Sequence, residues 1–199
     1  MRAAVFAAVV TVAGVEVRIP DRPLTDGVVT LRPWVEDDVA ALVAALDGEP
    51  EIEHWMHQIP QPYTDAEARA YVSASAVAWR AGTGATFAVL DEPGTIVGSV
   101  GMRVVDADDD IVEVGYWTAA PARRRGLTTR ALVLISRWLL EEVGAARVQL
   151  RADVENTASQ RVAERAGFAR EGILRSSGVN DRLGRRVDYA IYSLLPGEL

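Results

Sequence analysis

Three consecutive stretches in the middle of the chain have the composition and spacing of β-strands, and they constrain the fold more than any other feature. These stretches are residues 86–91, 95–105 and 111–118. Two turn signals separate them, Pro93-Gly94 and the acidic run 106–110. Because the connecting turns are short, the sequence predicts three strands of one sheet.

Strand and helix patterns also alternate on both sides of this centre. Before it, residues 28–34 resemble a strand and residues 37–46 carry apolar residues at helical spacing. The capping box from Thr64 to Glu67 then opens a helix that runs to about residue 80. After the centre we expect a helix (126–142), a strand (146–153), a short helix (156–165) and two strands (168–176 and 185–195). This order predicts a mixed α/β domain with one sheet.

The N-terminal 27 residues form a separate problem, because residues 3–15 are an apolar run after Arg2. A cleaved signal peptide is one interpretation. The run is too short to cross a bilayer as a helix, and its valines and Gly14 favour one or two added strands. Residues 18–27 read as a linker. We therefore expect an extension over 1–27, a domain over 28–199, and a cytoplasmic protein without a membrane partner.

Composition excludes several kinds of chemistry. The chain has no cysteine, so disulfides, thiolate nucleophiles and cysteine-ligated zinc are absent. His54 and His57 are the two histidines and do not form an H-E-x-x-H motif, so we expect no metal site. The acidic run 106–110 lacks the ligand order of a calcium loop and reads as a solvated turn. A net charge of -7 without a wide basic face argues against nucleic-acid binding.

A candidate anion site follows the third central strand. Residues 119–125 form a turn, and a helix begins near Gly126. The start of a helix offers free backbone N–H groups and the positive end of the helix dipole, and a glycine lets a phosphate approach closely. The arginines before Gly126 add charged donors. The local pattern predicts a phosphate or pyrophosphate site, while a solvated basic turn is the alternative.

These residues resemble the pyrophosphate motif of the GNAT superfamily of acetyltransferases, [QR]-x-x-G-x-[GA]. Here the motif reads Arg123-x-x-Gly126-x-Thr128. Thr128 replaces a small residue, and Arg124 stands where a glycine is common. The segments 54–72, 113–121 and 152–175 resemble, more narrowly, the branch that acetylates the N-termini of ribosomal proteins.

The resemblance implies a single-domain α/β (α+β) fold. Its seven-stranded sheet is mixed, mostly antiparallel, flanked by helices and splayed between the fourth and fifth strands, with acetyl-CoA in the gap. It implies direct acetyl transfer to a primary amine, either a protein N-terminus or a small amine, by a monomer or homodimer. A non-catalytic acyl-CoA-binding module and a transferase for another acyl group, such as succinyl, stay open as alternatives.

The resemblance also assigns roles to individual residues. Glu113 is the candidate base, although a strand carboxylate paired with an arginine is an equal alternative. Many family members place a tyrosine acid where Ala163 stands, so Ser159 is the candidate stand-in. The residues expected to contact the coenzyme are Trp117, Thr118, Arg123, Arg124, Arg125, Gly126, Leu127, Thr128, Thr129, Asn156 and Ser159.

The acceptor amine is expected beside the segment 54–72. Within it, His54, Trp55 and Tyr63 are the residues predicted to line the acceptor cleft. Because the unperturbed pKa of histidine is near neutrality, a histidine close to the amine is an alternative base.

Overall fold

One eight-stranded sheet organises the molecule. A computed structural model describes residues 11–12, 15–92 and 94–199. The strand order is β3-β4-β5-β6-β7-β8-β10-β9, and β7 and β8 are the parallel pair in an otherwise antiparallel sheet. The strands are β3 (Leu24–Thr25), β4 (Val29–Pro33), β5 (Gly84–Asp91), β6 (Ile96–Asp106), β7 (Ile111–Thr118), β8 (Arg147–Asp153), β9 (Ala169–Asn180) and β10 (Arg185–Leu194).

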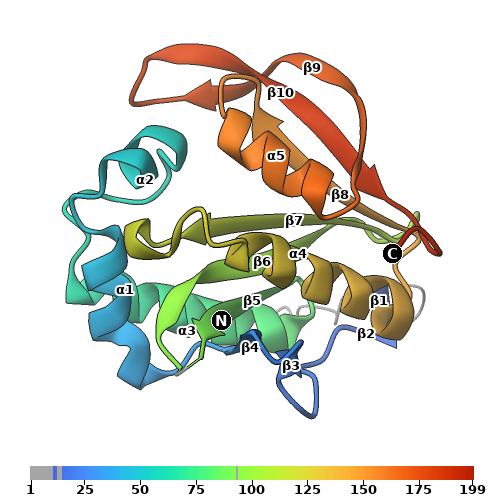
Figure 1. Cartoon of the computed structure of the whole chain (residues 1–199), viewed down its shortest axis with the longest axis horizontal. Coiled ribbons are helices and arrows are strands. Elements are labelled where there is room, and N and C mark those ends of the chain that lie inside the picture. The colour runs from blue at the N-terminus through green and yellow to red at the C-terminus, as the bar shows by residue number, and fades with distance from the viewer. Residues whose placement is uncertain (1–10, 13–14, 93) are drawn as a thin grey trace, which may run out of the picture.

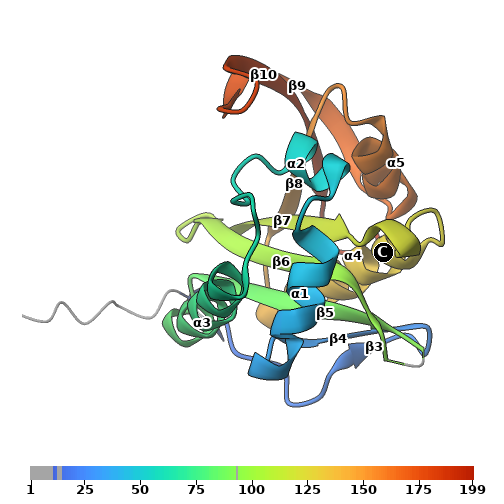
Figure 2. The same cartoon turned by 90° about the vertical axis from the view of Figure 1, so that its left-hand side faces the viewer.

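Helices cover both faces of this sheet. Figure 1 shows α4 across the strands β5 to β7 and α5 in front of β8 to β10. Turned by 90°, α3 and α4 lie on opposite sides of the sheet (Figure 2). The helices are α1 (Val39–Leu46), α2 (Pro50–Trp55), α3 (Asp65–Ala81), α4 (Leu127–Trp138) and α5 (Thr157–Arg165).

The main helices and strands match the sequence predictions, and the structure adds the short elements β3 and α2, which were not predicted. The sheet has the predicted seven strands plus β3, because Leu24 and Thr25 in the expected linker pair with β4. The short helix α2 lies in a segment without an apolar period. Glu49 caps it, since its side chain accepts a hydrogen bond from the Ile52 N–H at 2.8 Å, and Pro50 stands at its first position.

The predicted helix ends carry the expected signals. At the start of α3 the Thr64 N–H donates to the Glu67 carboxylate at 3.2 Å, and Gly82 ends this helix at a φ of +67°. The helix predicted over 126–142 divides in two, because a π-helical turn, Leu139–Val143, follows α4. None of the helices in the described ranges is long and apolar enough to cross a membrane.

The described part of the N-terminal extension contains two short strands. β1 (Thr11–Val12) and β2 (Val15–Glu16) pair with each other in a two-stranded sheet and do not extend the main sheet. Val12 and Val17 are fully buried in the main core, so this part packs on the domain. Residues 1–10 and 13–14 of the predicted strand region lie outside the described residues.

Two apolar clusters hold the layers together. In the larger, Phe87 on β5 meets Trp138 on α4 edge to face, with ring centroids 5.7 Å apart. In the smaller, Trp34 after β4 stacks on Trp117 of β7 at 6.3 Å. Successive side chains of β7 point to opposite faces of the sheet, so this strand contributes to both clusters. Val114 belongs to the larger cluster and Trp117 to the smaller one. The end of β7 is therefore fixed from both faces.

Candidate active site

The sheet opens into a gap between β7 and β8. These strands pair in register only at Ile111, Val112 and Glu113, and beyond Glu113 they separate. β7 stays paired with β6 up to Thr118 on its other side. Alternate backbone N–H and C=O groups of the unpaired half of β7 therefore face the gap. This opening lies between the fourth and fifth predicted strands, where the family resemblance implies a splay.

The turn after β7 places the start of α4 at this gap. Arg124 and Gly126 both adopt left-handed backbone, with φ of +61° and +77°. The first helical hydrogen bond runs from the Arg130 N–H to the Gly126 carbonyl at 3.2 Å, so the N–H groups of Leu127, Thr128 and Thr129 have no acceptor within the helix. No side chain of the described residues caps this end of α4. The backbone thus presents three free N–H groups where the sequence predicts an anion site, and anion binding there stays a prediction.

The arginine side chains of the turn have different partners. The Arg123 guanidinium donates to both carboxylate oxygens of Glu49, at 2.9 and 2.7 Å, and its Nε donates to the Thr118 carbonyl at 3.3 Å. Arg125 pairs with Asp91 at 3.0 Å, and Arg124 is exposed. The hydrogen bond from Arg123 holds the pKa of Glu49 below its usual value. Two of the three predicted charged donors therefore bind carboxylates of the chain itself.

The end of β7 contacts the first turn of α4 directly. The Thr118 and Thr128 hydroxyls form a short hydrogen bond, and both residues line a small cavity with Leu127. Thr128 is therefore accommodated at a position where the family motif has a small residue. Trp117 is buried in the core, so only its backbone can face the gap.

The gap divides the sheet into two arms, one ending at β7 and the other made of β8, β10 and β9. The start of α5, on the second arm, faces the gap. Asn156 caps this helix, since its Oδ1 accepts a hydrogen bond from the Ser159 N–H at 3.0 Å. An Asn amide carries separate acceptor and donor groups, so capping by Oδ1 leaves Nδ2 for another partner. The predicted cap is confirmed, and it does not compete with a contact to a coenzyme.

Tyr116 is a site residue that the sequence reasoning missed. Its hydroxyl oxygen lies 2.9 Å from the Ser159 Oγ and 3.0 Å from the Ser159 carbonyl oxygen, and each of these two atoms can accept its proton. Burial raises the pKa of the phenol to about 12, although the hydrogen bond to Ser159 opposes this shift. Tyrosine in a strand is an ordinary core residue, so only the splay reveals that this phenol spans two arms of the sheet.

Glu113 lies at the closed end of the gap, inside an ion-pair network. Its carboxylate accepts hydrogen bonds from Arg151 at 2.8 Å, Arg103 at 2.8 Å and Gln149 at 3.1 Å. Burial raises its pKa, but the bonds from Arg151 and Arg103 outweigh burial, and the pKa of Glu113 is lowered overall. Glu113 is therefore a strand carboxylate paired with arginines, which is the alternative to a catalytic base. Its role as the general base stays a prediction.

Comparisons with known proteins agree with this geometry. The family model described as the acetyltransferase (GNAT) domain matches residues 29–169. The chain belongs to the GNAT acetyltransferase family. The matched range contains the gap, the start of α4 and all of α5.

Individual GNAT relatives cover different shares of the chain. YdaF of Bacillus subtilis (strain 168), provisionally named a ribosomal N-acetyltransferase, is 34% identical over 106 residues, which are 53% of this chain and 56% of YdaF. The aligned part thus spans little more than half of that relative. Mycobacterium smegmatis RimJ, solved in complex with CoA-disulfide, is 25% identical with a TM-score of 0.76, over 89% of this chain and 88% of RimJ. The Microcin C7 self-immunity acetyltransferase MccE, solved with acetyl-CoA and AMP, shares the fold at 19% identity and a TM-score of 0.72, over 86% and 98% of the chains.

Arg124 has a left-handed backbone conformation at a position where this branch of the GNAT family commonly has glycine. Side chains at a φ of +61° meet a steric penalty that glycine avoids, and a glycine is common at this position of the branch. We expect Arg124→Gly to be more stable than Arg124→Ala by about 1 kcal/mol in urea denaturation. The same pair of changes at Arg125, which is outside the left-handed region, is the control. At position 125 the alanine variant should be at least as stable as the glycine variant. If glycine were more stable than alanine at both positions, or at neither, the backbone of Arg124 would not be strained.

The predicted acceptor residues of this GNAT domain do not share one environment. His54 and Trp55 lie on α2, where their rings meet edge to face at 4.3 Å, and His54 is exposed. Tyr63 is 4% exposed and packs in the core cluster that contains Trp34. Burial raises the pKa of Tyr63 to about 12. Its contact with an acceptor stays a prediction, and its observed role is packing.

Two arginine contacts hold α2 beside the site. Arg123 binds Glu49 at its start, and Arg182, in the turn between β9 and β10, donates to the Glu53 carbonyl at 3.0 Å near its end. Figure 1 shows α2 close to the β9–β10 turn and to the left of α5. No group of three or more metal-ligating side chains occurs in the part of the chain that the structure describes.

Proposed function

We propose that this chain transfers an acetyl group from acetyl-CoA directly to a primary amine. The observation that carries the proposal is the meeting of the β7–β8 gap with the uncapped start of α4. An anion site at the mouth of an extended slot suits a ligand with a pyrophosphate and a long flexible arm. The RimJ relative was solved with a coenzyme A derivative, which supports this choice of ligand.

The residues present fit the coenzyme. A Cβ built on Gly126 meets no atom within 4 Å, so the approach to the helix start is open. We assign the pyrophosphate to the N–H groups of residues 127–129, with exposed Arg124 as the charged donor nearby. Backbone groups of Trp117 and Thr118 and the Asn156 side chain are assigned to the pantetheine arm. The coenzyme supplies the acetyl group as a thioester.

The acceptor is assigned to the side of the gap covered by α2. His54 and Trp55 lie on this helix, and the chain's acidic balance suits a cationic amine. YdaF is named for ribosomal N-acetylation and RimJ is a relative at 25% identity, so we propose a protein N-terminal amine as the first acceptor class to test. The absence of cysteine is consistent with direct transfer and with no acyl-cysteine intermediate.

Turnover and binding test this proposal together. Calorimetry with acetyl-CoA should give a saturable one-site isotherm. Release of free thiol should then exceed the background with at least one member of a panel of peptides and small amines. Binding without turnover on any amine would favour a non-catalytic acyl-CoA-binding module. Faster turnover with succinyl-CoA than with acetyl-CoA would make succinyl, and not acetyl, the preferred acyl group.

Ser159→Ala tests the catalytic assignment. We expect kcat to fall roughly 10- to 100-fold, because the departing sulfur loses a hydrogen-bond donor, while the Kd for acetyl-CoA changes less than about 3-fold. Thr157→Ala removes an exposed hydroxyl from the same turn of α5 and is the matched control. Full activity of Ser159→Ala would remove Ser159 from the mechanism.

A further inference from the structure

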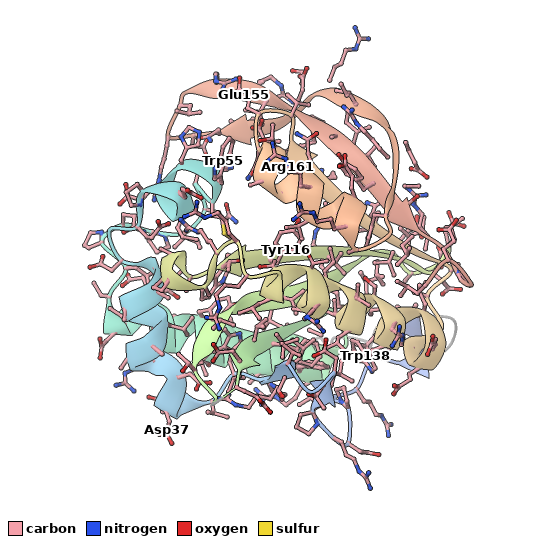
Figure 3. The ribbon with its side chains drawn as sticks, in the orientation of Figure 1. Asp37, Trp55, Tyr116, Trp138, Glu155 and Arg161 are labelled. Atoms are coloured by element: carbon pink, nitrogen blue, oxygen red, sulfur yellow. The ribbon has the colours of Figure 1, made fainter. Side chains whose placement is uncertain are left out.

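The Tyr116 phenol joins the two arms of the splayed sheet. Strands β7 and β8 last pair at Glu113, and Tyr116 follows three residues later on β7. Its hydroxyl nevertheless reaches Ser159 of α5, on the other arm, with its oxygen 2.9 Å from the Ser159 Oγ. Figure 3 shows Tyr116 in the space between β7 and α5. A polar bridge across the gap is therefore built from one phenol and one serine.

The backbone of Ser159 is fixed by the cap of its own helix. Its N–H donates to Asn156, which fixes the first turn of α5. Ala163, one turn further along the helix, is fully buried and too small to supply a hydroxyl. The phenol near Ser159 thus comes from the opposite strand, and not from the helix where many GNAT enzymes carry a tyrosine.

The direction of the Ser159 proton depends on Tyr116. A phenol has one proton, and here it has two acceptors, the Ser159 carbonyl and the Ser159 Oγ. If the phenol donates to Oγ, the serine proton is free to point into the gap. If the phenol donates only to the carbonyl, the serine hydroxyl can turn its proton toward the phenol oxygen. Because burial raises the pKa of Tyr116 to about 12, the phenol keeps its proton at neutral pH.

We propose that Tyr116 is a positioning residue that directs the Ser159 hydroxyl proton toward the departing sulfur of the coenzyme, an inference that rests on the proposed function. As the amine nitrogen bonds to the acetyl carbon, the C–S bond breaks and sulfur takes its electron pair. The Ser159 hydroxyl donates a hydrogen bond to this thiolate. The proton that the nitrogen gives up balances the charge when the thiolate becomes a thiol.

The first test compares two tyrosines that hold the same helix. Tyr192 on β10 donates to Gln160 and Glu164 of α5, both at 3.3 Å, and does not contact Ser159 through these bonds. We expect Tyr116→Phe to lower kcat at least 10-fold with the KM for acetyl-CoA within about 3-fold, and Tyr192→Phe to retain kcat within about 3-fold. Equal losses in both variants would mean that the phenols only place α5, and would overturn the proposal.

A second test needs no acceptor and no turnover. A hydrogen bond to the thiolate lowers the pKa of the bound thiol, so coenzyme A should bind more tightly as the pH rises toward the pKa of the free thiol. From pH 7 to 9 we expect the affinity for coenzyme A, relative to acetyl-CoA, to rise at least about 5-fold in the wild type and less than about 2-fold in Tyr116→Phe. Acetyl-CoA is the control because its sulfur does not titrate.

The two tests separate the proposal from the function on which it rests. Ser159→Ala should lose the same pH dependence as Tyr116→Phe, and melting temperatures confirm that each variant is folded. An unchanged pH dependence in folded Tyr116→Phe would overturn the assignment of Tyr116. Absence of turnover on every amine, with the pH dependence intact in the wild type, would count against the transferase and would leave Tyr116 assigned to the thiol.

Discussion

Replacing Gly126 by Glu is expected to weaken coenzyme A binding by at least roughly 100-fold. The glycine precedes the free N–H groups of α4, and the space around it is open, so the new carboxylate would stand where the pyrophosphate is assigned. Two like charges about 5 Å apart repel by about 3 kcal/mol at the effective dielectric of a protein surface, which corresponds to a factor of roughly 100. Calorimetry at low ionic strength measures the change directly.

Gly126→Ala separates charge from backbone strain. Both substitutions place a side chain at a φ of +77°, so both strain the turn. Only the glutamate adds a negative charge. The alanine variant should bind coenzyme A within about 10-fold of the wild type. If glutamate and alanine weakened binding equally, or if glutamate had no effect, the pyrophosphate would lie elsewhere.

Replacing Glu113 by Ala is expected to lower the free energy of unfolding by about 2 kcal/mol. The Glu113 side chain is 12% exposed, and its loss leaves Arg151 and Arg103 without their shared carboxylate. Removing one partner of a fully buried pair costs about 3–5 kcal/mol. The loss here is smaller because the Arg103 side chain is 56% exposed and can be solvated by water.

The pH dependence of this loss has a defined sign. The folded-state pKa of Glu113 lies below its ordinary value of 4.5, so its contribution to stability is complete above that value and disappears as the pH falls through the folded pKa. The stability difference between wild type and Glu113→Ala should therefore be constant near neutrality and narrow below pH 4.5. Glu155→Ala is the control, because the Glu155 and Arg185 side chains are 57% and 48% exposed and their pair should contribute less than about 1 kcal/mol.

Kinetics of Glu113→Gln distinguish the ion pair from the base. A carboxylate that accepts hydrogen bonds from two guanidinium groups is a weak base, so kcat at pH 8 should fall less than about 10-fold. A loss of roughly 100-fold or more, together with loss of the acidic limb of the pH–rate profile, would make Glu113 the general base.

The sequence carried enough information for the fold because the local signals agree with one another. Alternation predicted the three central strands, and Thr64, Gly126 and Asn156 marked helix starts that the structure contains. The helix α2 was missed although Pro50 and Glu49 are start signals, because six residues are too few for an apolar period. The two-residue strand β3 depends on pairing with β4, which local sequence does not reveal.

The side-chain partners in the site could not be predicted in the same way. Arg123 lies in the motif that predicts an anion, yet its guanidinium binds Glu49, which is 74 positions away in sequence. Tyr116 reaches Ser159 across 43 positions, and only because β7 and β8 separate before it. Such contacts depend on how the arms of the sheet are placed, and no local periodicity encodes that.

A crystal structure with coenzyme A tests the central claim most directly. The proposed function predicts the pyrophosphate on the N–H groups of Leu127, Thr128 and Thr129, the pantetheine arm between β7 and β8, and the sulfur within hydrogen-bond reach of Ser159. A coenzyme bound outside the β7–β8 gap, or with its pyrophosphate away from the start of α4, would contradict it.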